Sequence, residues 1–313
     1  MLRYIIRRLL YAIPILIGVS LATFVLFNVV ATPEQIAKKN LSSKNPTPEQ
    51  IQEWLKDHGY DKPLPVRFKD HMTEVMLFKF GKSDATDEDI WGMIKVGVGP
   101  SVSLMVMVLI AGTFVDLTVA LFVAYFRGTY IDAWGLFLCV LLMSISYVVY
   151  LITGQFMLGR ILKYYPSSGF REGADVWKFL LMPAAIGVVS SLGQYTRLYR
   201  TFVLEEMNQD YVRTARAKGV SEDRVLFGHV LKNAAIPILT SVVTQIPLLL
   251  MGSLLLESFF NIPGIGGMTV DAIFSQDFAV VRAMVFLGSV LYIIGYILTD
   301  ISYALVDPRV RLG

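Results

Sequence analysis

The stretch SVSLMVMVLIAGTFVDLTVALFVAYF, Ser101–Phe126, contains 26 residues and one charged side chain, that of Asp116. A bilayer core about 30 Å thick is crossed by roughly 20 apolar residues in a helix, because a helix satisfies its own backbone polar groups. The stretch is therefore predicted to cross a membrane.

Five further stretches of the 313-residue chain meet the same criterion. The six predicted spans are Leu9–Val30, Ser101–Phe126, Ala133–Leu158, Phe179–Val203, Pro237–Phe259 and Ala283–Val306. The first is longer than the 7–15 apolar residues of a signal peptide, so we interpret it as a retained span. Composition agrees, because 55% of the residues are hydrophobic and 17% charged, against about 25% charged in soluble domains.

Lysine and arginine near the spans predict the orientation, because cytoplasmic loops carry the excess of both. With both termini inside, the cytoplasmic set is Arg3, Arg7, Arg8, Arg127, Arg213, Arg216, Lys218, Arg224, Lys232, Arg309 and Arg311. Arg197 and Arg200 at the inner end of the fourth span add to it. The short outer loops carry Arg160, Lys163, Arg171, Lys178 and Arg282.

This orientation divides the chain into regions. Residues 1–8 form a cytoplasmic N-terminus, 9–30 the first span, and 31–100 an extracytoplasmic loop with short helices. Residues 101–306 form the core domain, with a cytoplasmic loop at 204–236, and 307–313 form a cytoplasmic tail. Within 31–100, Thr47 followed by Pro48 and Glu49 predicts the start of a helix.

Motifs for catalysis or for cofactor binding are missing. The sequence FGKS, Phe80–Ser83, lacks the leading glycine of a phosphate-binding loop, since Met76 stands at that position. Cys139 is the only cysteine and lies in an apolar run, so we interpret it as a buried apolar residue. The net charge of +3 is scattered, which argues against nucleic-acid binding. The three histidines, His58, His71 and His229, fit no metal or catalytic motif.

A charged segment, LEEMNQDYVRTARAKGVSEDRVLFGHVLKNAAIP, separates the fourth and fifth spans. Its pattern predicts a short helix over 210–218 that ends at Gly219, and a second helix capped by Ser221. Helices this short are marginal in isolation. Either the first helix docks on a partner, with the small residues Ala215, Ala217 and Gly219 allowing close approach, or the segment is a solvated connector.

Several motifs occur in a characteristic order. DYVRTARAKG at 210–219 is followed by Asn233, Ala234 and Pro237. The others are RYIIRRLLYAIPILIGVSLATFVLF at 3–27, YYPSSGF at 164–170, NIPGIG at 261–266 and DISYALVDPRVR at 300–311. Together they resemble the membrane permease subunits of binding-protein-dependent ABC importers, in the dipeptide, oligopeptide and nickel branch, first-permease type. Arg213 stands where the wider family has a glutamate, and the gap from Gly219 to Pro237 is longer.

The resemblance implies an all-α membrane protein with the type I ABC importer permease fold, six transmembrane helices and cytoplasmic termini. It implies a cytoplasmic coupling helix that docks on an ATPase through Asp210, Tyr211, Arg213, Thr214, Ala215, Arg216, Ala217, Lys218 and Gly219. It also implies a bacterial inner-membrane location and a translocation pathway formed with a homologous second permease.

The same resemblance implies partners and substrate. Two cytoplasmic ATPase subunits would bind ATP and magnesium, and an extracytoplasmic binding protein would deliver the solute, so this chain is neither an enzyme nor a cofactor-binding protein. Di- or oligopeptides are the expected substrate. Nickel or another small solute is an alternative within the family, and a secondary transporter is an alternative from a different class.

Polar residues inside the predicted spans are candidates for the pathway. Asp116 lies near the middle of the second span, where a charge is costly, so it either lines the pathway or a permease interface, or makes a structural hydrogen bond. Glu257 either contributes to an outer gate or caps the fifth span. Further candidates for the pathway or gate are Gln155, Gln194, Gln245, Pro263 and Gly264, although glutamines also join neighbouring helices.

Overall fold

The computed structural model describes residues 2–30, 32–41, 46–163, 165–171, 173 and 175–306. Its regular structure is helical throughout these residues, apart from one isolated bridge between Lys82 and Asp89. The longest helices are α1 (Leu2–Val30), α5 (Ile90–Tyr125), α8 (Val176–Met207) and α15 (Phe278–Val306). The predicted first, second, fourth and sixth spans lie within them, except for Phe126 at the end of α5.

Five described helices are long and apolar enough to cross a membrane, and a bent pair makes a sixth if it counts as one span. The five are Tyr4–Phe27, Ile90–Tyr125, Val176–Met207, Glu222–Val243 and Phe278–Ser302. The predicted all-α membrane architecture is therefore confirmed, with five or six candidate spans.

The predicted third span, Ala133–Leu158, is not one straight helix. It consists of α6 (Tyr130–Met143) and then α7 (Tyr147–Gly154) with the π-helix η1 (Gln155–Ile161), and the two halves meet at 92°. At the bend the Tyr150 hydroxyl donates to the Leu142 carbonyl at 2.8 Å. The Ile145 N–H also donates to this carbonyl, at 3.3 Å. A side chain and the backbone thus hold the bend together, which hydropathy alone does not reveal.

The predicted fifth span, Pro237–Phe259, is also broken. It begins within α11 (Leu231–Val243), continues through α12 (Ile246–Met251) and stops at Gly252, whose φ is +70°. A φ in this region favours glycine. The apolar residues that follow belong to α13 (Leu254–Phe260), which forms a hairpin with α14 (Ile265–Ser275). The span therefore ends at Gly252, although the residues that follow are still apolar.

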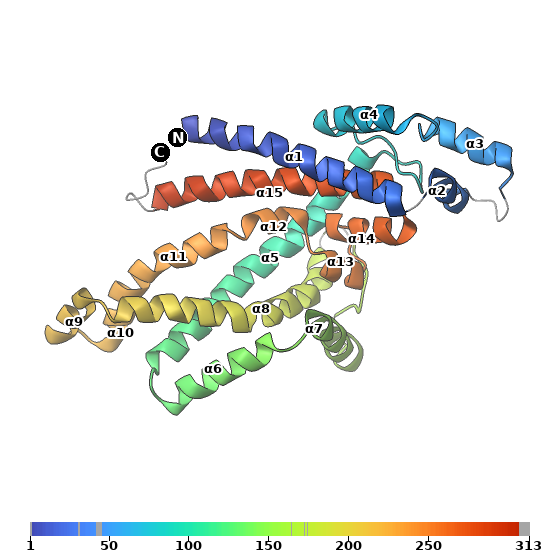
Figure 1. Ribbon diagram of the computed structural model, residues 1–313. Helices are drawn as coiled ribbons and strands as arrows, with labels where there is room; N and C mark the ends of the chain where they lie inside the picture. The colour runs from blue at the N-terminus through green and yellow to red at the C-terminus, as the bar shows by residue number, and fades with distance from the viewer. Residues whose placement is uncertain are drawn as a thin grey trace.

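The helices α1, α8 and α15 run along the long direction of one bundle, and α5 crosses it obliquely (Figure 1). α5 packs against α8, and α1 packs along α15. One end of the bundle carries the start of α1, the end of α15 and the short helices α9 (Asp210–Ala217) and α10 (Glu222–Arg224), which lead into the π-helix η2 (Val225–Val230). We call this the α9 end. The α13–α14 hairpin lies at the opposite end, with the helices of the first loop (Figure 1).

The first loop contains three short helices, as predicted: α2 (Pro33–Asn40), α3 (Pro48–Asp57) and α4 (Leu64–Met76). The expected helix start at Thr47 is confirmed. Its side chain accepts from the Gln50 N–H, while the Gln50 side chain accepts from the Thr47 N–H, a capping box. We call residues 32–41 and 46–89 the first-loop lobe.

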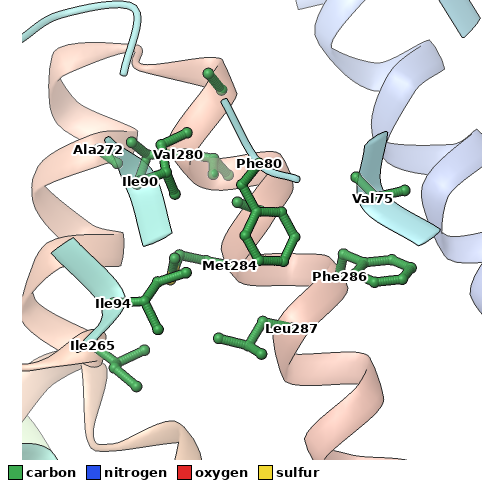
Figure 2. Close-up of a cluster of buried hydrophobic side chains, with 13 residues drawn as sticks. Val75, Phe80, Ile90, Ile94, Ile265, Ala272, Val280, Met284, Phe286 and Leu287 are labelled. Carbon is green, nitrogen blue, oxygen red and sulfur yellow. The ribbon is translucent and has the colours of Figure 1, made fainter. Parts of the chain in front are cut away.

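An apolar cluster joins the first-loop lobe to the bundle (Figure 2). Phe80 belongs to this cluster with residues of α5, α14 and α15, among them Ile90, Ile265 and Phe286, and its ring contacts that of Phe286. Full burial of such a side chain contributes about 1.5–3 kcal/mol. The first-loop lobe is therefore packed against α5, α14 and α15.

Hydrogen bonds fasten the same lobe to the start of α15. The Ser83 hydroxyl donates to Asp277 Oδ2 at 2.5 Å, and the Asp84 N–H donates to Asp277 Oδ1 at 3.1 Å. Asp84 Oδ2 in turn accepts from the Ala279 N–H at 3.1 Å and from the Tyr60 hydroxyl at 3.0 Å. Burial raises the pKa of Asp84. Both carboxylates thus satisfy N–H groups at a helix N-terminus.

Candidate functional site

The charged segment folds as a helix, a turn and a second helical stretch. α9 runs from Asp210 to Ala217, and Gly219 follows with φ +76°, which confirms the predicted helix and its end. Ser221 stands at the N-cap of α10, but its side chain makes no capping hydrogen bond. The expected hydroxyl cap is therefore wrong, and α10 continues into η2 after three residues.

One face of α9 packs against the chain's own helices. Val212 is 0% exposed and Ala215 is 7% exposed, within a cluster that includes Val225 and Val230 of η2. Ala215 therefore faces the core, although its small size suggested close approach by a partner. The other predicted residues of the segment are exposed: Asp210, Tyr211, Arg213, Thr214, Arg216, Ala217, Lys218 and Gly219.

Polar contacts hold α9 in this orientation. Arg216 makes a bidentate pair with Glu222, with Nε at 2.8 Å from Oε1 and Nη2 at 3.1 Å from Oε2. The Tyr211 hydroxyl donates to Glu206 Oε2 at 2.5 Å, and partial burial together with this bond raises the pKa of Tyr211 to about 12. The docked helix thus presents Arg213, Ala217 and Lys218 outward.

A cavity with both polar and apolar walls lies where α5 and α8 meet the start of α12. Asp116 and Gln245, two of the candidate pathway residues, line this space of about 120 Å³ together with Ser191, Tyr195 and Tyr199. Asp116 is 2% exposed, and its Oδ1 has no hydrogen-bond partner. Gln194 is exposed and does not line the cavity. Of the candidate pathway residues, Asp116 and Gln245 are thus the two that line this cavity.

Glu257 lies in a different kind of environment. It is 0% exposed, and its carboxylate accepts from the N–H groups of Ser253 at 2.9 Å, Gly266 at 2.8 Å and Gly267 at 3.1 Å. The last two belong to the first turn of α14, where the helix dipole favours a negative charge. Ser101 also contacts the carboxyl group and accepts from the Ile265 N–H at 2.8 Å. Glu257 of α13 thus links the two helices of the hairpin by hydrogen bonds to the first turn of α14.

The other hairpin candidates border a larger hollow. Pro263 and Gly264 line a cavity of about 680 Å³ between the hairpin, the start of α5 and the 83–89 strip of the first-loop lobe. Glu88, Asp89 and Asp271 give this hollow an acidic rim. Glu257 lines neither this hollow nor the cavity around Asp116. Gln155 donates to the Ser167 carbonyl at 2.7 Å.

Two polar pairs were not found from the sequence. Arg200 on α8 bonds to Asp132 on α6 at 2.6 Å, and both side chains are largely buried. At the α9 end, Arg8 pairs with Asp300 at 3.0 Å, and the Tyr4 hydroxyl donates to the same carboxylate at 2.5 Å. The partners are 68 and almost 300 positions apart, and no local spacing signals them. Tyr164 and residues 307–311, which carry part of the motifs, lie outside the described residues.

These observations define a class of protein. The described residues form a helical bundle with five or six candidate spans and a cavity with both polar and apolar walls. Among the same residues, no group of three or more histidine, cysteine or acidic side chains is placed to hold a metal ion. Such an arrangement is that of a helical multi-pass membrane protein.

Comparison with known proteins identifies the family. Residues 116–312 match the family of binding-protein-dependent transport system inner membrane components, and residues 1–104 match the N-terminal family of the same transport systems. The chain belongs to this family of permeases. It is 33% identical over 339 residues to the "Di/tripeptide transport system permease protein DppB" of Pseudomonas aeruginosa, with 99% of each chain covered. It is 30% identical over 321 residues to a "Probable peptide ABC transporter permease protein" of Sinorhizobium fredii, covering 98% of this chain and 99% of that one.

Membership settles several expectations. The chain is a permease subunit of an ABC importer and a multi-pass protein of the inner membrane. It is not an enzyme and binds no cofactor, because ATP is bound by partner ATPases in this family. Its family works in complexes with an ATPase and a binding protein. A secondary transporter, the alternative from another class, is ruled out by the family.

Proposed function

We propose that this subunit carries di- or oligopeptides inward, along a pathway that it encloses with a homologous second permease. Relatives named as peptide permeases, alignable over nearly the whole chain, support peptides as the substrate.

In the proposed complex, one of the two ATPase subunits binds the α9 end, which lies in the cytoplasm together with both termini. The observation that carries this assignment is the packing of α9. Its Val212 and Ala215 face is docked on the chain's own core, so a push on the exposed face is transmitted to α8 and η2. The exposed positive charges of Arg213 and Lys218 agree with a cytoplasmic location.

The binding protein then meets the opposite end. The hollow of about 680 Å³ offers it a surface built jointly from the first-loop lobe and the turn at Pro263 and Gly264. The first-loop lobe is bonded to Asp277 at the start of α15, and the hairpin turn is held by Glu257. A binding protein at this surface therefore contacts segments that are connected to the helices.

The coupling assignment is tested with Ala217→Glu, because Ala217 is exposed on α9. A carboxylate at this position is expected to lower the ATP hydrolysis stimulated by the liganded binding protein at least tenfold, and to weaken co-purification of the ATPase. Ala217→Ser is the matched control and should behave as wild type. Ala215→Glu would not discriminate, because it places a charge in the core.

Unchanged ATPase binding and unchanged hydrolysis in a folded Ala217→Glu complex would contradict the assignment of α9. The substrate is tested separately, by mass spectrometry of the ligand that co-purifies with the cognate binding protein. Di- or oligopeptides are expected, and a nickel chelate or a sugar would overturn the peptide proposal while leaving the coupling proposal intact.

A further inference from the structure

The cavity around Asp116 has the size and depth of a small binding site. Its volume is about 120 Å³, enough for a water-sized group and several waters. Asp116 lies nine residues before Tyr125, the last residue of α5, which at 1.5 Å per residue is about 14 Å. Half of a bilayer core is about 15 Å. The carboxylate therefore lies near mid-membrane if α5 ends at the membrane surface.

Among the described residues, one oxygen of this carboxylate has no hydrogen-bond partner. Asp116 Oδ1 and the neighbouring Thr196 Oγ1 are both buried and without a hydrogen bond. No ion pair among the described residues includes Asp116, and Arg200, which lies on the adjacent helix, is bound to Asp132. An ionised carboxylate is costly to bury when nothing compensates its charge.

The surrounding groups complement a cation with hydrogen-bond donors. The Gln245 amide nitrogen donates to the Ser241 carbonyl at 3.2 Å, which leaves lone pairs on the amide oxygen. Hydroxyl groups of Thr113, Ser191 and Tyr199 also line the space. One negative charge and several neutral oxygens suit a primary ammonium, which offers three donors and one positive charge. They do not suit a transition metal, which prefers nitrogen or sulfur ligands or several carboxylates.

We propose that Asp116, with Gln245 and Tyr199, forms a subsite of the translocation pathway that binds the primary ammonium group of the solute during its passage. For a peptide this group is the N-terminus. The inference rests on the proposed function, because it takes the cavity to lie on the pathway and the solute to carry an ammonium group.

The test uses the complete importer in proteoliposomes with its binding protein, and measures ATP-driven uptake of radiolabelled dialanine. Asp116→Asn keeps the shape of the side chain and removes its charge. It is expected to slow uptake at least tenfold, while binding of dialanine to the binding protein and stimulated ATP hydrolysis stay within twofold. Asp116→Glu restores the charge and should recover at least a third of the wild-type rate. Thr118→Ala, on the exposed face of α5 and outside the cavity, is the control and should stay within threefold.

A second probe separates the ammonium from the rest of the peptide. N-propionyl-alanine has the backbone of dialanine without the amino group, and its uptake at saturating concentration should be equally slow in the wild type and in Asp116→Asn. A purely structural role of Asp116 would lower uptake of both probes by the same factor. Wild-type uptake of dialanine by Asp116→Asn, or an equal loss for both probes, overturns the subsite.

The two proposals fail in different ways. If the wild-type importer transports no peptide but transports an amine, with a tenfold loss in Asp116→Asn, the peptide assignment falls and the ammonium subsite stands. If the solute proves to be an uncharged sugar, both fall. If dialanine is transported equally by the wild type and Asp116→Asn, the subsite falls alone.

Discussion

Glu257 and Asp116 are both acidic residues buried among apolar helices, 0% and 2% exposed, but their surroundings are opposite. Glu257 accepts three backbone N–H bonds, two of them from the first turn of α14. Asp116 has an oxygen without any hydrogen bond and borders a cavity. Glu257 thus stabilises the α13–α14 hairpin, whereas one carboxylate oxygen of Asp116 can still accept a hydrogen bond.

The difference teaches that burial among apolar helices does not by itself distinguish a structural acid from an acid that is free to bind a solute. What distinguishes them is whether the fold supplies donors. For Glu257 it does so through a break in the apolar run, where Gly252 and Gly264 leave room for the carboxylate and the helix N-terminus faces it. The two helices that flank Asp116, α5 and α8, are continuous there, so their N–H groups are bonded within the helices.

The largest effect is expected from Gly264→Ala. A Cβ at this position would collide with Glu257 Oε2 and Ser101 Oγ, although the backbone φ of −104° suits any residue. Overpacking together with displacement of a buried carboxylate should cost about 3 kcal/mol or more. Thermal unfolding of the purified importer, followed by circular dichroism, measures the loss. Gly18→Ala is the control, because no atom lies within 4 Å of a Cβ there.

If Gly264→Ala has the same melting temperature as the wild type, the carboxylate of Glu257 is not held as tightly as its hydrogen bonds indicate. Glu257 and Asp116 would then no longer differ in this respect, because both side chains would have room to move. A large loss in Gly18→Ala would instead show that any added methyl group destabilises the bundle.

The helices and the coupling segment were largely predictable from sequence, because hydropathy and helix-ending residues act locally. α9 ends before Gly219 as its pattern indicates, and α8 covers the fourth span. The contacts that decide the role of each polar residue were not predictable. Asp84 and Asp277 meet across 193 positions, and the run through Gly252 remains apolar on both sides of the break. Only the packed structure shows that Glu257 is satisfied and Asp116 is not.

His71 offers a second buried group without a partner, this time outside the membrane spans. It is 7% exposed, stacks on Phe24 of α1, and its Nε2 has no hydrogen bond. Burial, with a smaller contribution from Arg282 of α15, lowers the pKa of His71 from 6.5 to about 4. Between these values the unfolded chain binds the proton and the folded chain does not, so stability falls as the pH is lowered through this window.

The expected loss between pH 7 and pH 5 is about 1–2 kcal/mol, measured as a fall in the melting temperature of the importer. His71→Phe should remove this part of the pH dependence and keep the stacking on Phe24. The raised pKa of Asp84 has the opposite effect, because it stabilises the fold as the pH is lowered. Asp84 is present in both the wild type and the variant, so the difference between their pH profiles reports His71 alone. An equal acid sensitivity in His71→Phe would show that the histidine has a partner in the complete complex.

The smallest change in stability is expected from Asp116→Asn, and its sign is the sharpest test of the comparison. Because no donor is lost, removal of the charge should leave the free energy of unfolding unchanged or raise it by up to about 1 kcal/mol. Glu257→Gln is the matched change and should lower it by about 2–3 kcal/mol, because the new amide group meets N–H donors. Both variants are compared with the wild type by thermal unfolding in the absence of substrate. A loss of 2 kcal/mol or more in Asp116→Asn would mean that the second permease supplies a cation to this carboxylate, and the two acids would then play the same structural part.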